Sequence, residues 1–151
     1  MQKSFKDKVY LTCLIILDEK IASLEGVIAG LAEGAENDSK SSAGDKHETS
    51  RAMMQIEQEK AGLQLREARD QKGVLLQTGV NPALQWIAKG SLVKTDKCFL
   101  FVCIALGRIR VEGLEVICLS HLSPLGKKLM GLKQNETAEV AGTKYRIEKV
   151  S

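Results

Sequence analysis

The longest regular pattern of apolar residues lies in the first third of the chain. Apolar side chains recur there at alternating intervals of four and three residues, at Tyr10, Leu14, Leu17, Ile21, Leu24, Ile28 and Leu31. This spacing is typical of a helix that packs lengthwise against a second helix. Gly26 and Gly30 each weaken an isolated helix by about 1 kcal/mol relative to Ala. The pattern therefore predicts a long helix that depends on a partner for its stability.

A turn and a second helix are predicted next. Between Gly34 and Gly44 the apolar pattern stops and small or polar residues take over, which indicates a solvated turn. From about Lys46 to Gln77 the chain is rich in Glu, Gln, Lys, Arg, Met and Leu, all of which are good helix formers. The two helices should form an antiparallel hairpin, and an arm of about 30 residues would be about 45 Å long.

Two apolar patterns compete for the inner face of the second helix. Ile56 and Leu63 share one, and the other contains Met54, Ala61, Leu65, Ala68 and Leu75. The sequence leaves open which of them faces the first helix. Met53 and Met54 are both expected in the core, because Met fills irregular apolar gaps. Extra apolar residues near the start of the first helix predict a contact with a second domain, namely Leu11, Cys13, Ile15 and Ile16.

The second half of the chain alternates short apolar runs with turns. Gly79, Asn81 and Pro82 mark its beginning. Apolar runs at 91–94, 98–105, 109–111, 114–119, 137–140 and 145–150 predict about five strands. Ser123 followed by Pro124 is a good helix start, so a short helix ending at Gly131 should pack on the sheet. The expected fold class is α+β, with a helical hairpin over residues 1–78 and a small β-sheet domain over 79–151.

The charge is divided between the two halves. The whole chain carries a net charge of +3, but residues 1–78 have a formal charge of −2 and residues 79–151 have +5. A protein that binds nucleic acid by itself should present one continuous basic surface. The division argues against that class and favours a large partner with both acidic and basic surfaces.

The four cysteines, Cys13, Cys98, Cys103 and Cys118, lack the spacing of a zinc site. Three lie in apolar, strand-like runs, where a free Cys behaves as a small hydrophobe. Buried thiols and a reducing cytoplasm are therefore expected. The uncharged run 9–17 is shorter than the about 20 residues that span a bilayer, and charged residues follow it where a cleavage site would need small ones. We expect no targeting segment there.

Two acidic residues lie where the turn meets the second helix. Asp45 and Glu48 are three residues apart, so in a helix their Cβ atoms are about 5–6 Å apart on one face. Such a pair can share a Mg²⁺ whose other positions are filled by water or phosphate oxygens. The same spacing suits a helix cap, with Asp45 at the N-cap and Glu48 at the third helical position. Spacing alone favours the cap.

Three segments resemble one protein family. The run 44–49, Gly-Asp-Lys-His-Glu-Thr, resembles the acidic tip Gly-Asp-x-x-Glu-Asn of GreA and GreB, the bacterial transcript-cleavage factors. The run 123–133, Ser-Pro-Leu-Gly-Lys-Lys-Leu-Met-Gly-Leu-Lys, resembles the Ser-Pro-x-Gly-x-x-Leu-x-Gly-Lys element of their C-terminal domain, and the run 90–93 resembles the start of that domain's sheet. The matches follow the family order and span nearly the whole chain. Thr49 replaces the family's Asn, and Lys46 and His47 fill the middle positions.

The resemblance implies a fold and a function. Residues 79–151 would form an FKBP-like domain that docks on bacterial RNA polymerase through Ser123, Pro124, Leu125 and Gly126. The hairpin would enter the polymerase's secondary channel. There Asp45 and Glu48 would hold a second Mg²⁺ beside the polymerase's own and stimulate cleavage of a backtracked transcript.

Further expectations concern the RNA and the setting. Lys40, Lys46 and Arg51 would lie near enough to touch a phosphate at the 3′ end of the nascent RNA, although solvated side chains are the simpler interpretation for these residues. The factor would be a cytoplasmic monomer with no membrane contact. It would not be an enzyme itself, because it would stimulate the polymerase's own nuclease activity.

Two other classes of function remain open. A regulator of the Rnk or DksA kind inserts an acidic-tipped hairpin into the same channel without promoting cleavage. A peptidyl-prolyl isomerase is suggested by the FKBP-like domain alone, and that activity uses an aromatic-lined pocket. Residues 79–151 offer only Trp86, Phe99, Phe101 and Tyr145 for such a pocket. We place the isomerase last, because a fold does not carry a function.

Overall fold

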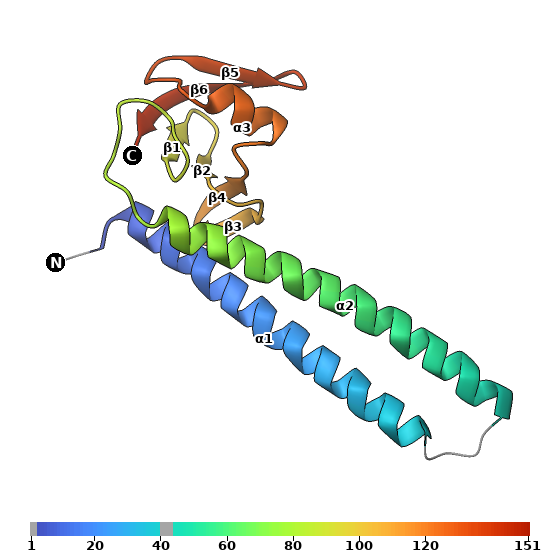
Figure 1. Ribbon diagram of the computed structural model, residues 1–151. Helices are drawn as coiled ribbons and strands as arrows, with labels where there is room; N and C mark the ends of the chain where they lie inside the picture. Colours follow the sequence, from blue (N-terminus) through green and yellow to red (C-terminus); the bar gives the residue numbers. More distant parts are fainter. Residues whose placement is uncertain (1–2, 40–43) are drawn as a thin grey trace. The chain divides into compact units, whose positions relative to one another are not determined.

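The computed structural model describes residues 3–39 and 44–151. It confirms the α+β class, since two long helices are followed by a six-stranded mixed sheet and a short helix (Figure 1). The contacts of the chain divide it into two compact units. We call Met1–Ile15 with Gly73–Ser151 the sheet unit, and Ile16–Lys72 the helical unit. The predicted boundary at residue 79 separates the long helices from the strands. The contacts divide the chain differently, because they group the start of the first helix and the end of the second helix with the sheet.

The two long helices are α1 (Phe5–Ser39) and α2 (Gly44–Thr78). α1 starts at a reciprocal cap, in which Ser4 Oγ accepts a hydrogen bond from Asp7 N at 3.1 Å and Asp7 Oδ2 accepts one from Ser4 N at 3.2 Å. α2 ends at Thr78. The next residue, Gly79, has a φ of 62°, which suits glycine, and its N–H donates to Leu75 O.

The predicted turn over 34–44 is too long. α1 continues to Ser39, because residues such as Ala and Glu sustain a helix after the apolar pattern has ended. α2 then begins at Gly44. Residues 40–43, which include Lys40, lie outside the described residues.

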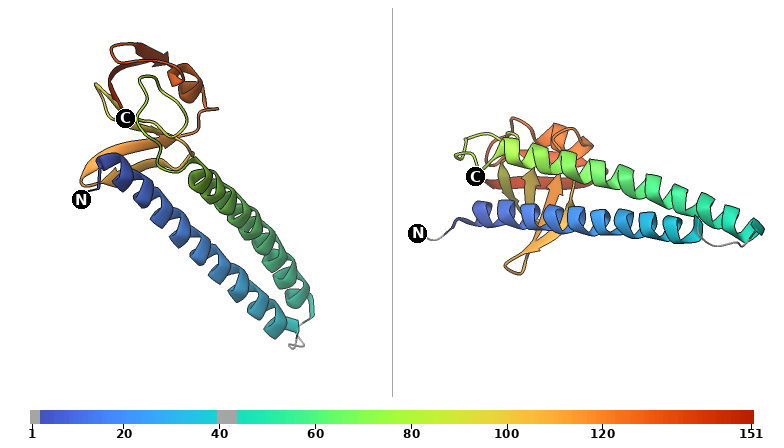
Figure 2. Two further views of the ribbon diagram at one scale, coloured as in Figure 1. Left: turned by 60° about the vertical axis from the view of Figure 1, so that its left-hand side comes forward. Right: turned by 60° about the horizontal axis from the view of Figure 1, so that its bottom comes forward.

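Within the helical unit, α1 and α2 run antiparallel, as the hairpin prediction required (Figure 2). Ion pairs join them, from Arg69 Nη2 to Glu25 Oε1 at 2.9 Å and from Lys72 Nζ to Asp18 Oδ1 at 2.6 Å. The apolar pattern of α1 is confirmed as an inner face, because each of its seven residues is buried or half-buried.

On α2, the structure selects one of the two competing patterns. The inner face contains the buried residues Ala61, Leu65, Ala68 and Leu75. Ile56 and Leu63 are 62% and 57% exposed and so face outward. Met54 is half-buried near Gly34, but the expectation for Met53 is wrong, since its side chain is 63% exposed. Neighbouring helix positions point about 100° apart, so only one of the two methionines can face inward.

The sheet unit contains six strands rather than about five, because each apolar run forms a strand of its own. The strands are β1 (Leu92–Thr95), β2 (Phe99–Val102), β3 (Gly107–Val111), β4 (Leu114–Leu119), β5 (Thr137–Val140) and β6 (Thr143–Val150). Their order is β3-β4-β2-β1-β6-β5, and β2 and β4 are parallel whereas the other neighbours are antiparallel. Two tight turns with positive φ, at Glu112–Gly113 and Ala141–Gly142, close the β3–β4 and β5–β6 hairpins.

The two faces of the sheet are covered differently. The short helix α3 (Pro124–Leu129) packs through Leu129 on one face, together with core residues such as Leu100, Val102 and Ile147. Side chains that alternate with these along the strands point to the other face. There the Phe99 ring lies 4.9 Å from the Phe5 ring of α1. The predicted contact between the base of the first helix and the second domain is thus confirmed, and Cys13 takes part in it, with its sulfur 3.6 Å from that of Cys118. The expectation for Ile15 is wrong, since its side chain is 56% exposed.

No helix in the described part of the chain combines the length and the apolar character that crossing a lipid bilayer requires.

Candidate functional site

The two predicted acidic residues lie at the start of α2. Because α2 begins at Gly44, Asp45 lies inside its first turn rather than at the N-cap, as the cap interpretation had placed it. An acidic residue is favourable in the first turn, where the helix dipole is positive. Positions 45 and 48 remain three residues apart on one continuous helix, so they share a face. The Glu48 side chain is exposed, so its carboxylate is open to a ligand from outside the chain.

The structure describes the three predicted RNA-contacting residues to different extents. Lys40 lies outside the described residues. Position 46 is in the first turn of α2. Successive positions on a helix are rotated by about 100° around its axis, so positions 45 and 46 lie on different faces. Arg51 is exposed and lies three residues beyond Glu48, which places both on neighbouring parts of one face. Among the described residues, no group of three or more potential ligands could hold a metal ion.

The predicted docking residues surround the start of α3, where they have structural tasks as well. Ser123 is the N-cap, and its Oγ accepts a hydrogen bond from Gly126 N at 3.1 Å and donates one to Ser120 O at 2.7 Å. Pro124 follows as the first helical residue and is exposed. Leu125 packs partly against the core, and Gly126 is buried. Of the four residues, Pro124 is therefore the one that is open to a partner.

The structure adds an apolar residue that sequence reasoning missed. Leu122, two positions before Pro124, is 66% exposed. Lys127 and Lys128 are also exposed, and Lys128 Nζ donates to Glu139 O at 2.8 Å. We call Leu122, Pro124, Lys127 and Lys128 the α3 patch. Its apolar start could have been noticed in the sequence, since a leucine directly before an N-cap Ser belongs to neither the strand nor the helix.

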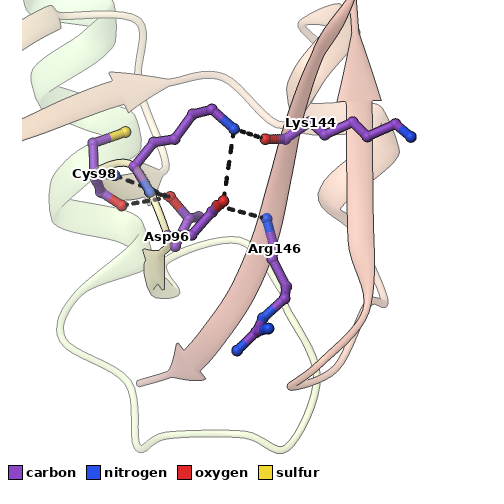
Figure 3. A network of polar contacts seen from close by, with 6 residues as sticks. Asp96, Cys98, Lys144 and Arg146 are labelled. Carbon is purple, nitrogen blue, oxygen red and sulfur yellow. Dashed lines mark hydrogen bonds and ion pairs between the residues drawn. The ribbon is translucent and has the colours of Figure 1, made fainter.

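A pocket of about 380 Å³ lies elsewhere in the sheet unit. Asp96, Cys98 and Glu115 are among the residues that line it. Figure 3 shows Asp96 beside Arg146, whose backbone N donates to Asp96 Oδ1 at 2.8 Å. That hydrogen bond, with help from the nearby Lys97 charge, lowers the pKa of Asp96 below its ordinary value.

The polar groups around Asp96 already pair with one another. Lys97 Nζ lies 3.7 Å from Asp96 Oδ2 and also donates to Lys144 O (Figure 3). The Lys97 ammonium is 5.5 Å from the centre of the Tyr145 ring. This network joins the β1–β2 turn to β6, so we interpret it as structural.

No protein-family model and no curated protein matches the chain. A function must therefore be argued from the residues of the chain, from the helix that carries Asp45 and Glu48 and from the α3 patch. The start of α2 belongs to the helical unit and the α3 patch to the sheet unit.

Proposed function

We propose that this protein is an RNA polymerase-binding elongation factor of the Gre kind, which inserts its acidic tip into the secondary channel and stimulates cleavage of backtracked transcripts. The observation that carries the proposal is the position of the acids. Asp45 and Glu48 are the second and the fifth residue of the 35-residue helix α2. Acids near the start of a helix also interact favourably with its dipole, and the common face of these two would in addition allow them to share one cation.

The chemistry follows from what Mg²⁺ requires. Mg²⁺ is octahedral and is usually held by one or two carboxylates, with water and phosphate oxygens in its other positions. Asp45 and Glu48 would supply the carboxylates, and the transcript would supply phosphate oxygens. Together with the Mg²⁺ that the polymerase holds, this second ion would stabilise the attacking water and the leaving oxygen. The protein would thus lend ligands to an active site that belongs to its partner.

Arg51 suits a supporting role in the same reaction. Its guanidinium is exposed one helical step from Glu48 and would bind a phosphate of the transcript. Lys46 and Lys40 are the other proposed RNA contacts, because both lie within six residues of Asp45. The negative charge of the RNA phosphates would then be balanced in part by these basic side chains.

The sheet unit would provide docking. We propose an FKBP-like domain for residues 79–151, which is compatible with a mixed sheet and a short helix on one of its faces. The α3 patch combines an exposed leucine and proline with two lysines, and residues 79–151 carry a net charge of +5. An apolar anchor with a basic surrounding suits an acidic rim on the partner, because charge complementarity speeds encounter and apolar contacts hold the complex.

The positions of the aromatic residues argue against the isomerase alternative, because most of these side chains pack in the interior of the sheet unit. Phe101 is buried, with 1% of its surface exposed. Phe99 packs against Phe5, and Tyr145 packs against the core. Trp86 alone is left 47% exposed. An aromatic-lined substrate pocket would require these rings to gather around one cavity.

The test is a cleavage assay on polymerase complexes that have been stalled and backtracked on a 3′-labelled transcript. Adding the wild-type protein with Mg²⁺ should release short labelled 3′ fragments and allow elongation to resume. Binding should be measured in parallel with a fluorescently labelled factor. Binding without fragments would instead identify a non-cleaving channel regulator. Absence of both binding and cleavage would reject the polymerase as the partner.

A further inference from the structure

Two cysteines that are far apart in the sequence meet inside the sheet unit. Cys13 belongs to α1 and Cys118 to β4, and their sulfur atoms are 3.6 Å apart. Both residues are buried, with exposed fractions of 0% and 2%. They lie on the sheet face opposite α3, where α1 covers the strands. Each thiol has the other within hydrogen-bond distance, and the buried thiol of Cys103 is near enough to interact electrostatically with both.

The contact makes the two thiols unequal. A hydrogen bond with Cys118 lowers the pKa of Cys13, although burial opposes this effect. The same hydrogen bond and burial together raise the pKa of Cys118. Either sulfur can be the donor in the neutral pair; when Cys13 is the thiolate, the Cys118 S–H donates to its sulfur and stabilises the charge. A thiolate attacks electrophiles whereas a thiol does not, so Cys13 is the reactive member of the pair.

The other two cysteines lack this arrangement. Burial raises the pKa of the Cys98 thiol, which is only half-buried, and its backbone N–H donates to Thr95 Oγ1. Burial also raises the pKa of Cys103, which is buried near Thr78. These two thiols provide internal references for reactivity, one more accessible than the pair and one equally buried.

We propose that Cys13 and Cys118 are an oxidation site, a dithiol that a small neutral hydroperoxide converts into a disulfide. The Cys13 thiolate attacks one oxygen of hydrogen peroxide, so an S–O bond forms, the O–O bond breaks, and hydroxide leaves and takes up a proton. The Cys118 sulfur then attacks the sulfur of the resulting sulfenic acid. The S–S bond forms as the S–O bond breaks, and the hydroxyl group leaves as water with the Cys118 proton. Two thiols lose two electrons, and one peroxide becomes two waters.

The geometry suits this reaction better than it suits other modifications. A disulfide needs the sulfur atoms at about 2.05 Å, so they must approach by about 1.5 Å from their present distance. Burial excludes bulky charged oxidants such as glutathione disulfide, since exchange requires access to the attacked sulfur. A mixed adduct has no room in a close-packed layer, whereas a disulfide takes up less space than two thiols.

The bond would fasten the start of α1 to the sheet. The two residues are 105 positions apart, so the crosslink would close a long loop and restrict the unfolded chain strongly. The oxidised protein should therefore unfold at a higher temperature than the reduced one. For the same reason of access, a small neutral dithiol rather than glutathione would reverse the change. The inference does not depend on which partner the protein has.

The experiment treats the folded, reduced wild-type protein with stoichiometric hydrogen peroxide and follows it by intact mass and peptide mapping. The expected result is a mass lower by two hydrogen atoms and a linked peptide pair containing Cys13 and Cys118, formed before Cys98 is oxidised. Cys98→Ser should behave like the wild type, and Cys118→Ala should give no linked pair. Two results would overturn the proposal. One is a linked pair of Cys13 and Cys118 that forms only when the protein is unfolded in urea, and the other is complete oxidation of Cys98 while Cys13 and Cys118 are still free thiols.

A second measurement needs no variant. The thermal midpoint of the oxidised wild-type protein should exceed that of the reduced protein by at least about 5 °C and return after treatment with dithiothreitol. An unchanged or lowered midpoint would show that the bond does not fasten α1 to the sheet.

Discussion

Gly126 illustrates how a single residue can be fixed by its surroundings. A Cβ atom at this position would lie 2.0 Å from Ser120 O and 2.9 Å from His121 Cα. Both are backbone atoms, so the clash cannot be relieved by a side-chain rotation. The glycine of the Ser-Pro-x-Gly run therefore has a packing reason of its own, separate from any role in docking.

We expect Gly126→Ala to destabilise the protein by about 1–3 kcal/mol, in the range of overpacked core substitutions. The measurement is the free energy of unfolding in urea. Chemical shifts of the sheet unit should change around α3, because the helix start has to move. A variant as stable as the wild type would mean that the loop before α3 yields easily.

Asp96 should contribute to the pH dependence of stability. Its folded-state pKa is lowered by the hydrogen bond from Arg146 N and by Lys97. A lowered pKa stabilises the fold above the unfolded value of about 3.9, and this stabilisation is lost as the pH falls through the folded-state pKa. In Asp96→Asn the thermal midpoint should fall less steeply below about pH 4 than in the wild type. Parallel profiles of the two proteins between pH 2 and about pH 7 would rule out this contribution.

At the scale of elements, the long helices carry glycines that the packing does not require. A Cβ at Gly62 of α2 would meet nothing within 4 Å. Gly62→Ala should therefore stabilise the protein by up to about 1 kcal/mol, through the higher helix propensity of Ala. Gly34→Ala is the matched comparison. Its Cβ would lie 3.3 Å from Met54 Cε, so this variant should gain less stability than Gly62→Ala. Urea unfolding of both variants checks this, and a loss of stability in Gly62→Ala would contradict it.

Local patterns were enough to predict the elements themselves. The heptad spacing of α1 predicted its inner face, because a helix repeats its faces with nearly the same period. Ser123 and Pro124 predicted the start of α3, because capping depends on adjacent residues only. The end of α1 was missed, since exposed helix turns need no apolar signal.

What required the structure was non-local. Nothing within α2 distinguishes the outward Ile56 and Leu63 from the inward Leu65 and Ala68. The parallel pairing of β2 with β4 and the meeting of Cys13 with Cys118 join residues far apart in the chain. The docking prediction shared this limit. Leu125 packs against the core, whereas Leu122 faces solvent. This difference follows from how α3 packs on the sheet, which the local sequence does not specify.

At the scale of the whole molecule, the α3 patch should determine affinity for the polymerase. Leu122→Ala and Pro124→Ala should each weaken binding by about tenfold, a loss of about 1.4 kcal/mol. Stability should change little for Leu122→Ala, since its side chain is exposed. Leu114→Ala is the control, because this leucine of β4 is 46% exposed and lies outside the patch. Equal affinities for all three variants and the wild type would remove the patch from the interface.

The association rate should also depend on salt. It should fall as the Debye length shrinks from about 30 to about 8 Å, if the positive charge of residues 79–151 guides the encounter. The decrease should be similar in Leu122→Ala, because that substitution removes no charge.

The central claim is that Asp45 and Glu48 supply the activity by holding a Mg²⁺. Its most direct test is the single-turnover rate of transcript cleavage at saturating factor, for the wild type, for Asp45→Asn with Glu48→Gln, and for the control Glu59→Gln, an exposed acid farther along α2. The double variant should bind as well as the wild type, since a lost helix-end interaction costs only about 1 kcal/mol. We predict that its cleavage rate falls by more than about 100-fold and recovers partly at high Mg²⁺, while Glu59→Gln stays at the wild-type rate. A bound double variant that cleaves as fast as the wild type would contradict the account.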